Sequence, residues 1–133
     1  MKVLLDTNVL VSAAVARGLC TDVLREVLAK HELVVCPQIL SELRRILRSK
    51  FGMPKELIEG FVGLFQQDAI CPQSGTLPAL NLKDKDDLGI LTAARSGNAI
   101  MIVTGDKELQ TLGHFFDIKI MSPRQFWQKL TTQ

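Results

Sequence analysis

Short apolar runs alternate with longer amphipathic segments along the whole chain. The apolar runs predict strands at Lys2–Leu5, Glu32–Cys36, Asp68–Cys71, Ile100–Val103 and Ile118–Met121. Apolar residues that recur three or four positions apart predict helices at Thr7–Ala16, Thr21–Lys30, Pro37–Ser49, Pro54–Gln67, Asp84–Ser96, Asp106–Leu112 and from Ser122 onward. Short apolar strands separated by helices are typical of a parallel sheet. We therefore predict an α/β fold with helices on both faces of the sheet.

Length and composition are those of one soluble domain that spans residues 1–133. The net charge of +2 and pI of about 8.5 are only weakly suggestive of a nucleic-acid partner. Three cysteines without a C-x-x-C pair argue against a disulfide framework or a zinc cluster. The sequence contains no signal-peptide apolar region and no run of about 18 apolar residues. We therefore expect a cytoplasmic protein without a membrane association.

Two aspartates stand at junctions between a predicted strand and the helix that follows it. Asp6 follows the strand in "KVLLDTNVL", and Asp106 follows the strand in "IMIVTGDKEL". The carboxyl ends of parallel strands meet at one edge of a sheet, where ligands of such folds bind. Each aspartate could also be a helix N-cap, for which Asp is a preferred residue. Both explanations remain open for either residue.

A third acid lies at the start of the helix in "DKDDLGILTAA". Asp87 is three, four and seven positions before Ile90, Leu91 and Ala94, so it belongs to the apolar stripe of its helix. A carboxylate on a buried face is costly unless it is paired or binds a metal. The alternative is a partly solvated acid in the first turn, where the helix dipole favours negative charge.

A fourth acid, Glu42, lies at the flank of the inward stripe in "PQILSELRRILRSK". Its alternative explanation is an ordinary solvated residue that pairs with Arg45 or Arg48. Clustered carboxylates repel one another unless protons or cations neutralise them. Oxygen ligands select hard ions such as Mg²⁺ or Mn²⁺. His31 and His114 have no metal-ligand spacing, so we interpret both as structural or surface residues.

Together the segments "LLDTNVLVSA", "ILSELRRIL", "DKDDLGILTAA", "IVTGDKEL" and "GHFFDIKIMSPRQFW" resemble the PIN domain. They are most similar to the branch that comprises toxin components of bacterial toxin–antitoxin pairs. The resemblance covers essentially the whole chain. It implies a PIN-like three-layer sandwich with a central parallel sheet of about five strands. It also implies a Mg²⁺- or Mn²⁺-dependent ribonuclease, acting as an endonuclease, in which the cation readies water to attack a phosphodiester.

The resemblance also implies a role for each matching residue. The catalytic acids would be Asp6, Glu42, Asp87 and Asp106, of which Asp6, Asp87 and Asp106 would be the metal ligands. Asn8 and Thr104 would orient carboxylates or water from behind them, and Asp86 would be a substitute or supporting acid. The partners implied are RNA, a protein antitoxin and a second copy of the chain in a homodimer.

Basic side chains near the acids are candidates for contact with RNA phosphates. These candidates are Arg44, Arg45, Arg48 and Lys107. The alternative is an ordinary solvated helix face. Six Phe, one Trp and no Tyr give little material for stacking bases.

Other functions remain as alternatives to a ribonuclease. One is a non-catalytic RNA- or protein-binding module on the same fold, which the complete set of four acids disfavours. Another is a DNA-directed nuclease with the same acidic site. A phosphate-accepting receiver domain is disfavoured, because the first junction has a single acid and no aspartate follows the strand "ELVVC".

Overall fold

The computed structural model describes residues 1–66, 69 and 85–132. Its strands are β1 (Lys2–Leu5), β2 (Glu32–Val34), β3 (Met101–Val103), β4 (His114–Phe115) and β5 (Ile118–Met121). Its helices are α1 (Thr7–Val15), α2 (Leu19–Lys30), α3 (Pro37–Ser49), α4 (Lys55–Gln66), α5 (Lys85–Ser96), α6 (Lys107–Leu112) and α7 (Pro123–Thr131).

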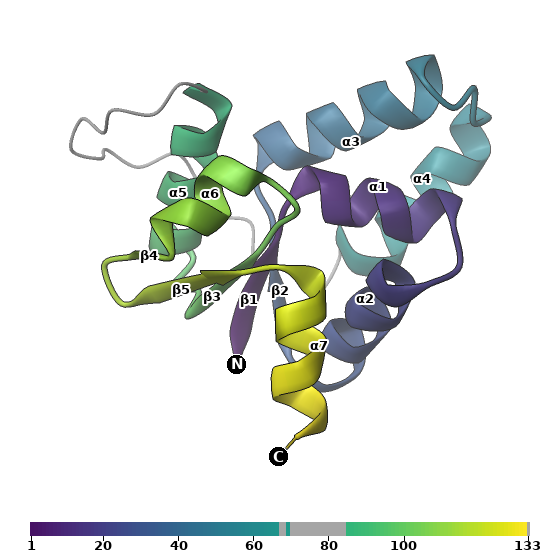
Figure 1. The fold of residues 1–133 in the computed structure, drawn as a ribbon. Coiled ribbons are helices and arrows are strands. Elements are labelled where there is room, and N and C mark those ends of the chain that lie inside the picture. Colours follow the sequence, from purple (N-terminus) through teal and green to yellow (C-terminus); the bar gives the residue numbers. More distant parts are fainter. Residues whose placement is uncertain (67–68, 70–84, 133) are drawn as a thin grey trace.

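The five strands form one sheet in the order β2-β1-β3-β5-β4. The pairs β1–β2, β1–β3 and β3–β5 are parallel. Figure 1 shows α5 and α6 on one side of the sheet and α1, α2 and α7 on the other. The predicted α/β sandwich is therefore confirmed, and most predicted elements lie within a residue or two of their expected bounds.

One strand departs from the prediction of an all-parallel sheet. β4 runs antiparallel to β5 and forms the edge of the sheet, with His114 opposite Lys119. Its two residues are too few to show a period-two pattern in the sequence. The hairpin depends on Phe116, whose φ of 54° lies in the left-handed region and reverses the chain after the strand. The predicted strand Asp68–Cys71 falls on residues that, apart from 69, lie outside those described.

The sheet and the inward faces of the helices form one hydrophobic core. Val3, Leu4 and Leu5 of β1 are completely buried, as a central strand covered on both faces requires. On α3, Leu43 and Leu47 are also completely buried, which confirms the stripe predicted there. This core fixes the positions of the loops at the carboxyl ends of β1 and β3.

Helices α1 and α2 meet at a sharp bend of 107° and pack against each other. Val9 and Leu10 of α1 and Val23 and Val27 of α2 are buried. Among the residues that the structure describes, no single helix is long and apolar enough to cross a membrane. In that part of the chain, only α1 and α2, counted as one segment despite their bend, reach that length and apolar composition.

Candidate active site at the carboxyl edge of the sheet

Asp6 ends β1 and is held by contacts from two separate parts of the chain. Its backbone N–H donates to the carbonyl of Val103 in β3 at 3.0 Å. Its Oδ1 accepts from the N–H of Thr7 at 2.7 Å, and its Oδ2 accepts from the hydroxyl of Thr104 at 2.6 Å. A typical N-cap accepts from the second or third helical N–H, whereas Thr7 is the first. Capping of α1 therefore does not by itself explain this carboxylate, which is 4% exposed.

Asp106, by contrast, is a regular N-cap of α6. Its Oδ1 accepts from the N–H groups of Glu108 and Leu109 at 2.8 and 3.2 Å. These are the second and third residues after the cap, which is the usual capping geometry. The capping explanation therefore holds for Asp106. Both capping bonds go to the same oxygen, so the cap alone does not use Oδ2 of this carboxylate.

Two polar side chains join the loop after β1 to the loop after β3. The completely buried hydroxyl of Thr104 donates to Asp6 and accepts from the backbone N–H of Asp106 at 3.0 Å. Asn8 accepts from the N–H of Gly105 at 3.0 Å and donates to Oδ2 of Asp6 at 3.4 Å. The resemblance implies orienting roles for both residues: Thr104 contacts both aspartates, whereas Asn8 contacts Asp6 and the backbone next to Asp106.

Burial and neighbouring charge raise the pKa of Asp6 above its usual value. Desolvation is the largest cause, and the negative charges of Asp106 and Glu42 act in the same direction. The hydrogen bonds from Thr104 and Thr7 oppose them by favouring the ionised form. Asp106 and Glu42, two of the other predicted acids, are thus close enough to act on Asp6.

Glu42 lies half-buried on α3, and its partner is a residue that the sequence interpretation missed. Its Oε1 accepts from Nε2 of Gln38 at 3.2 Å, one helical turn earlier. In the described part of the chain no ion pair joins Glu42 to Arg45 or Arg48, the alternative considered from the sequence. The four-residue spacing of Gln38 and Glu42 was the available signal, since such pairs face each other on a helix.

Asp87 lies in the first turn of α5 and is 3% exposed. Ile90, Leu91 and Ala94 of the same helix are also buried, so the predicted inward stripe is confirmed. The side chain of Asp86, predicted as a supporting acid, lies outside the described part.

Gln110 is a second residue that the sequence interpretation missed. It donates to the carbonyl of Thr104 at 2.7 Å and holds the loop after β3.

The sequence of residues 2–108 matches the family model of the PIN domain. The chain belongs to the PIN domain family. Members of this family are generally nucleases. No protein among the curated sequences matches the chain.

Two solved structures share the fold of this PIN domain. The crystal structure of VapBC2 from Rickettsia felis, bound to a DNA fragment from their promoter, aligns with a TM-score of 0.63 and 16% identity over 92% of this chain and 98% of that chain. FitAcB from Neisseria gonorrhoeae aligns with a TM-score of 0.55 and 18% identity over 91% and 97% of the two chains. At these identities, the likeness is one of fold.

The acids of this PIN domain supply hard oxygen donors, which suit a divalent cation such as Mg²⁺ or Mn²⁺. Among the described side chains, no group of three or more Asp, Glu, His or Cys is arranged so that it could already hold an ion. The chemistry nevertheless fits, because Asp6 is a buried carboxylate whose ionised form is disfavoured by burial and by two neighbouring acids. A bound cation would offset these effects.

The basic candidates differ in their surroundings. The guanidinium of Arg44 donates to both carboxylate oxygens of Glu59 on α4, at 3.0 and 3.2 Å. This pair connects α3 to α4 and engages Arg44 within the fold. Arg45, Arg48 and Lys107 are exposed, and Lys107 is adjacent to Asp106. We therefore retain these three as candidates for phosphate contact.

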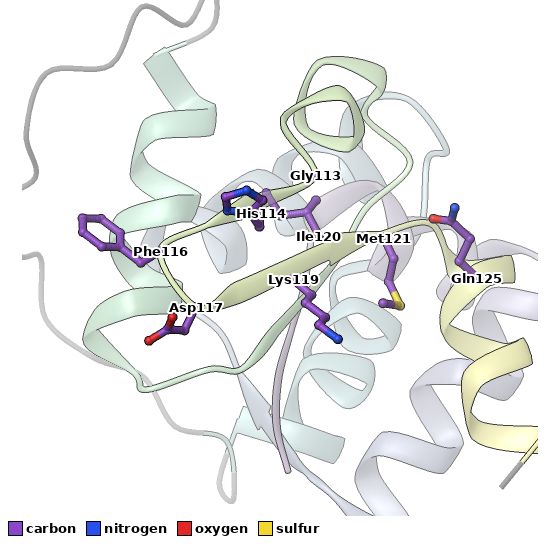
Figure 2. Close-up of a pocket in the computed structure, with 8 residues that line it drawn as sticks. All are labelled: Gly113, His114, Phe116, Asp117, Lys119, Ile120, Met121 and Gln125. Atoms are coloured by element: carbon purple, nitrogen blue, oxygen red, sulfur yellow. The ribbon is translucent and has the colours of Figure 1, made fainter.

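A surface hollow of about 660 Å³ lies along the β4–β5 hairpin (Figure 2). Its lining includes His114, Lys119 and Met121 from the hairpin and Gln125 from α7. None of the four acids lines it. The candidate site is therefore defined by its polar contacts and charges.

Proposed function

We propose that this PIN domain is a Mg²⁺- or Mn²⁺-dependent endoribonuclease. One observation carries the proposal: the buried carboxylate of Asp6 is hydrogen-bonded to Thr104 from another junction and is influenced by the charges of Asp106 and Glu42. A structural cap needs none of these long-range contacts. Such a group of acids is suited to cation-assisted hydrolysis of phosphodiesters.

Each residue has a separate task in this proposal. Asp6, Asp87 and Asp106 would hold the cation, and Glu42 would complete or support that set. A bound cation would supply activation of water and neutralisation of charge on the phosphate. Thr104 fixes one oxygen of Asp6 at 2.6 Å, so the carboxylate does not have to be oriented when substrate arrives.

The RNA backbone would lie along the exposed side of α3 and the start of α6. Arg45 and Arg48 are three residues apart on α3, which puts them on one face, and Glu42 lies three residues before Arg45. Lys107 follows Asp106 directly. Positive side chains beside acids of opposite sign can guide the phosphate chain to the cleavage site.

The biological role proposed is that of a toxin with an antitoxin partner. Its support is the fold shared with the VapBC2 and FitAcB structures.

Helix α4 offers an apolar surface for self-association. Phe65 belongs to the core, whereas Leu57 and Leu64 of α4 are 62% and 67% exposed. We propose a homodimer that covers part of this apolar surface. Light scattering of wild type and Leu64→Asp tests this: the wild type should have twice the mass of the variant.

The catalytic proposal is tested by RNA cleavage with Mn²⁺ present or chelated. We expect the wild type to cleave single-stranded RNA only with the cation, and Asp6→Asn and Asp87→Asn to lose cleavage while remaining folded. Asp22→Asn is the matched control, because Asp22 is an exposed acid in the first turn of α2. It should cleave normally.

The same assay separates the alternatives. Binding of RNA without any cleavage indicates a non-catalytic module. Preferential cleavage of DNA of the same sequence indicates a DNA-directed nuclease. Wild-type activity of Asp6→Asn with Mn²⁺ would refute the assignment of the site.

A further inference from the structure

A glycine in the interior of α5 leaves space for a side chain from α3. Gly89 is the fifth residue of this 12-residue helix, where glycine is intrinsically unfavourable. A Cβ atom at this position would overlap Oε1 of Gln38 and lie 3.1 Å from its Cδ. The carboxamide of Gln38 therefore lies directly against the backbone of α5, and any larger residue would have to displace it.

The same carboxamide also contacts one of the acids. While its oxygen lies at Gly89, its Nε2 donates to Oε1 of Glu42 at 3.2 Å. Gly89 is two residues after the buried Asp87. A single side chain of α3 thus links the position of the helix that carries Asp87 to the orientation of the Glu42 carboxylate.

We propose that Gln38 is a positioning residue for the cation site, and that Gly89 is glycine so that Gln38 can reach Glu42. The inference rests on the proposed function, because Glu42 and Asp87 are assigned to that site. Gln38 acts through Glu42, which it holds by a hydrogen bond, and has no contact with substrate in this proposal. A glycine that is poor for the helix is thereby explained by what packs against it.

The substitution Gly89→Ala gives the first test, because its two consequences have opposite signs. Alanine is a better helix former than glycine, so the metal-free protein should melt at the same temperature or higher. The added Cβ should displace Gln38 and weaken Mn²⁺ binding about tenfold, as changes behind a metal ligand commonly do. Mn²⁺ affinity is measured by calorimetry or by electron paramagnetic resonance, and therefore independently of turnover.

Gly60→Ala is the matched control. Gly60 is also inside a helix, α4, but nothing lies within 4 Å of a Cβ added there. It should leave Mn²⁺ affinity unchanged. A general effect of replacing a helical glycine would change the Mn²⁺ affinity of both variants. Under the proposal, only Gly89→Ala, the variant beside Gln38, loses Mn²⁺ affinity.

Gln38→Met and the double variant with Gly89→Ala test whether the two residues act together. Methionine retains the bulk of Gln38 without its N–H donor, so Mn²⁺ affinity should fall about tenfold. Adding Gly89→Ala to Gln38→Met should cause no further loss, because the donor that the alanine displaces is already absent.

The outcomes distinguish this inference from the proposed function. If the wild type binds Mn²⁺ and both Gly89→Ala and Gln38→Met bind it equally well, positioning by Gln38 is refuted while the nuclease proposal stands. Losses that add up in the double variant also refute it, since the residues then act independently. Absence of Mn²⁺ binding by the wild type overturns the proposed cation site and this inference together.

Discussion

Replacement of Thr104 by valine removes the hydroxyl that joins the two aspartate junctions and keeps nearly the same shape. Thr104 is completely buried, and Asp6, which it contacts, is only 4% exposed. The substitution removes the donor to Oδ2 of Asp6 at 2.6 Å and the acceptor for the N–H of Asp106 at 3.0 Å. Both losses should appear as a lower free energy of unfolding.

The magnitude follows from the kinds of bond that are lost. A hydrogen bond to a charged group contributes about 1.5–3 kcal/mol, and a buried donor left without an acceptor costs about 1–3 kcal/mol. Because the Asp106 N–H is only partly buried, we take the lower part of that range and expect Thr104→Val to destabilise the protein by about 2–4 kcal/mol at pH 7.5. That is a large share of a typical stability of about 5–15 kcal/mol.

The loss should depend on pH. Burial raises the pKa of Asp6 in the folded protein above its usual value. Stability from this group is therefore fully present at pH below the unfolded pKa and decreases as pH rises through the folded one. The Thr104 bond favours the ionised carboxylate, so its removal raises the folded pKa of Asp6 further. The difference between wild type and variant should grow from about pH 4 to pH 7.5.

Urea unfolding in the presence of a chelator measures this difference at each pH. Thr104→Ser keeps the hydroxyl and should restore most of the pH dependence. Thr111→Val is the control for loss of a threonine hydroxyl on an exposed helix, where Thr111 donates only to the carbonyl of Lys107. A destabilisation by Thr104→Val that is equal at pH 4 and pH 7.5 would refute the role assigned to ionised Asp6.

Three further outcomes follow from the same contacts. In chelator at pH 7.5, Asp6→Asn should lose less stability than Thr104→Val, because the amide has no charge to bury; urea unfolding at pH 4 should show a smaller difference between the two. Saturating Mn²⁺ should raise the free energy of unfolding of the wild type by about 2.7 kcal/mol at 100 times its dissociation constant, and should not do so for Asp6→Asn; thermal melts with and without the ion measure this. Arg44→Ala breaks the partly exposed pair with Glu59, so it should cost less than about 1 kcal/mol in stability and leave RNA affinity unchanged. In contrast, the double variant Arg45→Ala with Arg48→Ala should bind RNA more weakly and with a smaller salt dependence in a titration.

The two aspartates at the strand–helix junctions could be predicted from the sequence, because each lies between an apolar strand and an amphipathic helix. Asp6 and Asp106 are each preceded by a buried strand and followed by a helix, and parallel strands bring such junctions to one edge. The burial of Asp87 was likewise predictable from its spacing to Ile90 and Leu91. In both cases the pattern lies within a few residues and its physical consequence does not depend on distant parts of the chain.

Contacts between distant segments could not be predicted in this way. Arg44 and Glu59 are 15 residues apart and meet because α3 and α4 pack together, so the sequence alone left Arg44 among the RNA candidates. Strand β4 forms through the backbone conformation of Phe116, which no pattern of apolar residues encodes. Gln38 and Gly89 are 51 positions apart, and nothing in the sequence around either residue indicates that the two lie against each other.

The carboxyl edge of the sheet combines groups that stabilise the fold with a buried charge that destabilises it. Thr104 and Asn8 join the loops after β1 and β3, and they do so by binding Asp6, whose charge the surrounding protein disfavours. Replacing Asp6 by an apolar residue would remove the cost of burying its charge but would also leave the Thr104 hydroxyl without its acceptor. A divalent cation at the proposed site would resolve the conflict, because it would neutralise the acids and leave the hydrogen bonds in place. The stability of this protein and its proposed chemistry should therefore respond to the same ion.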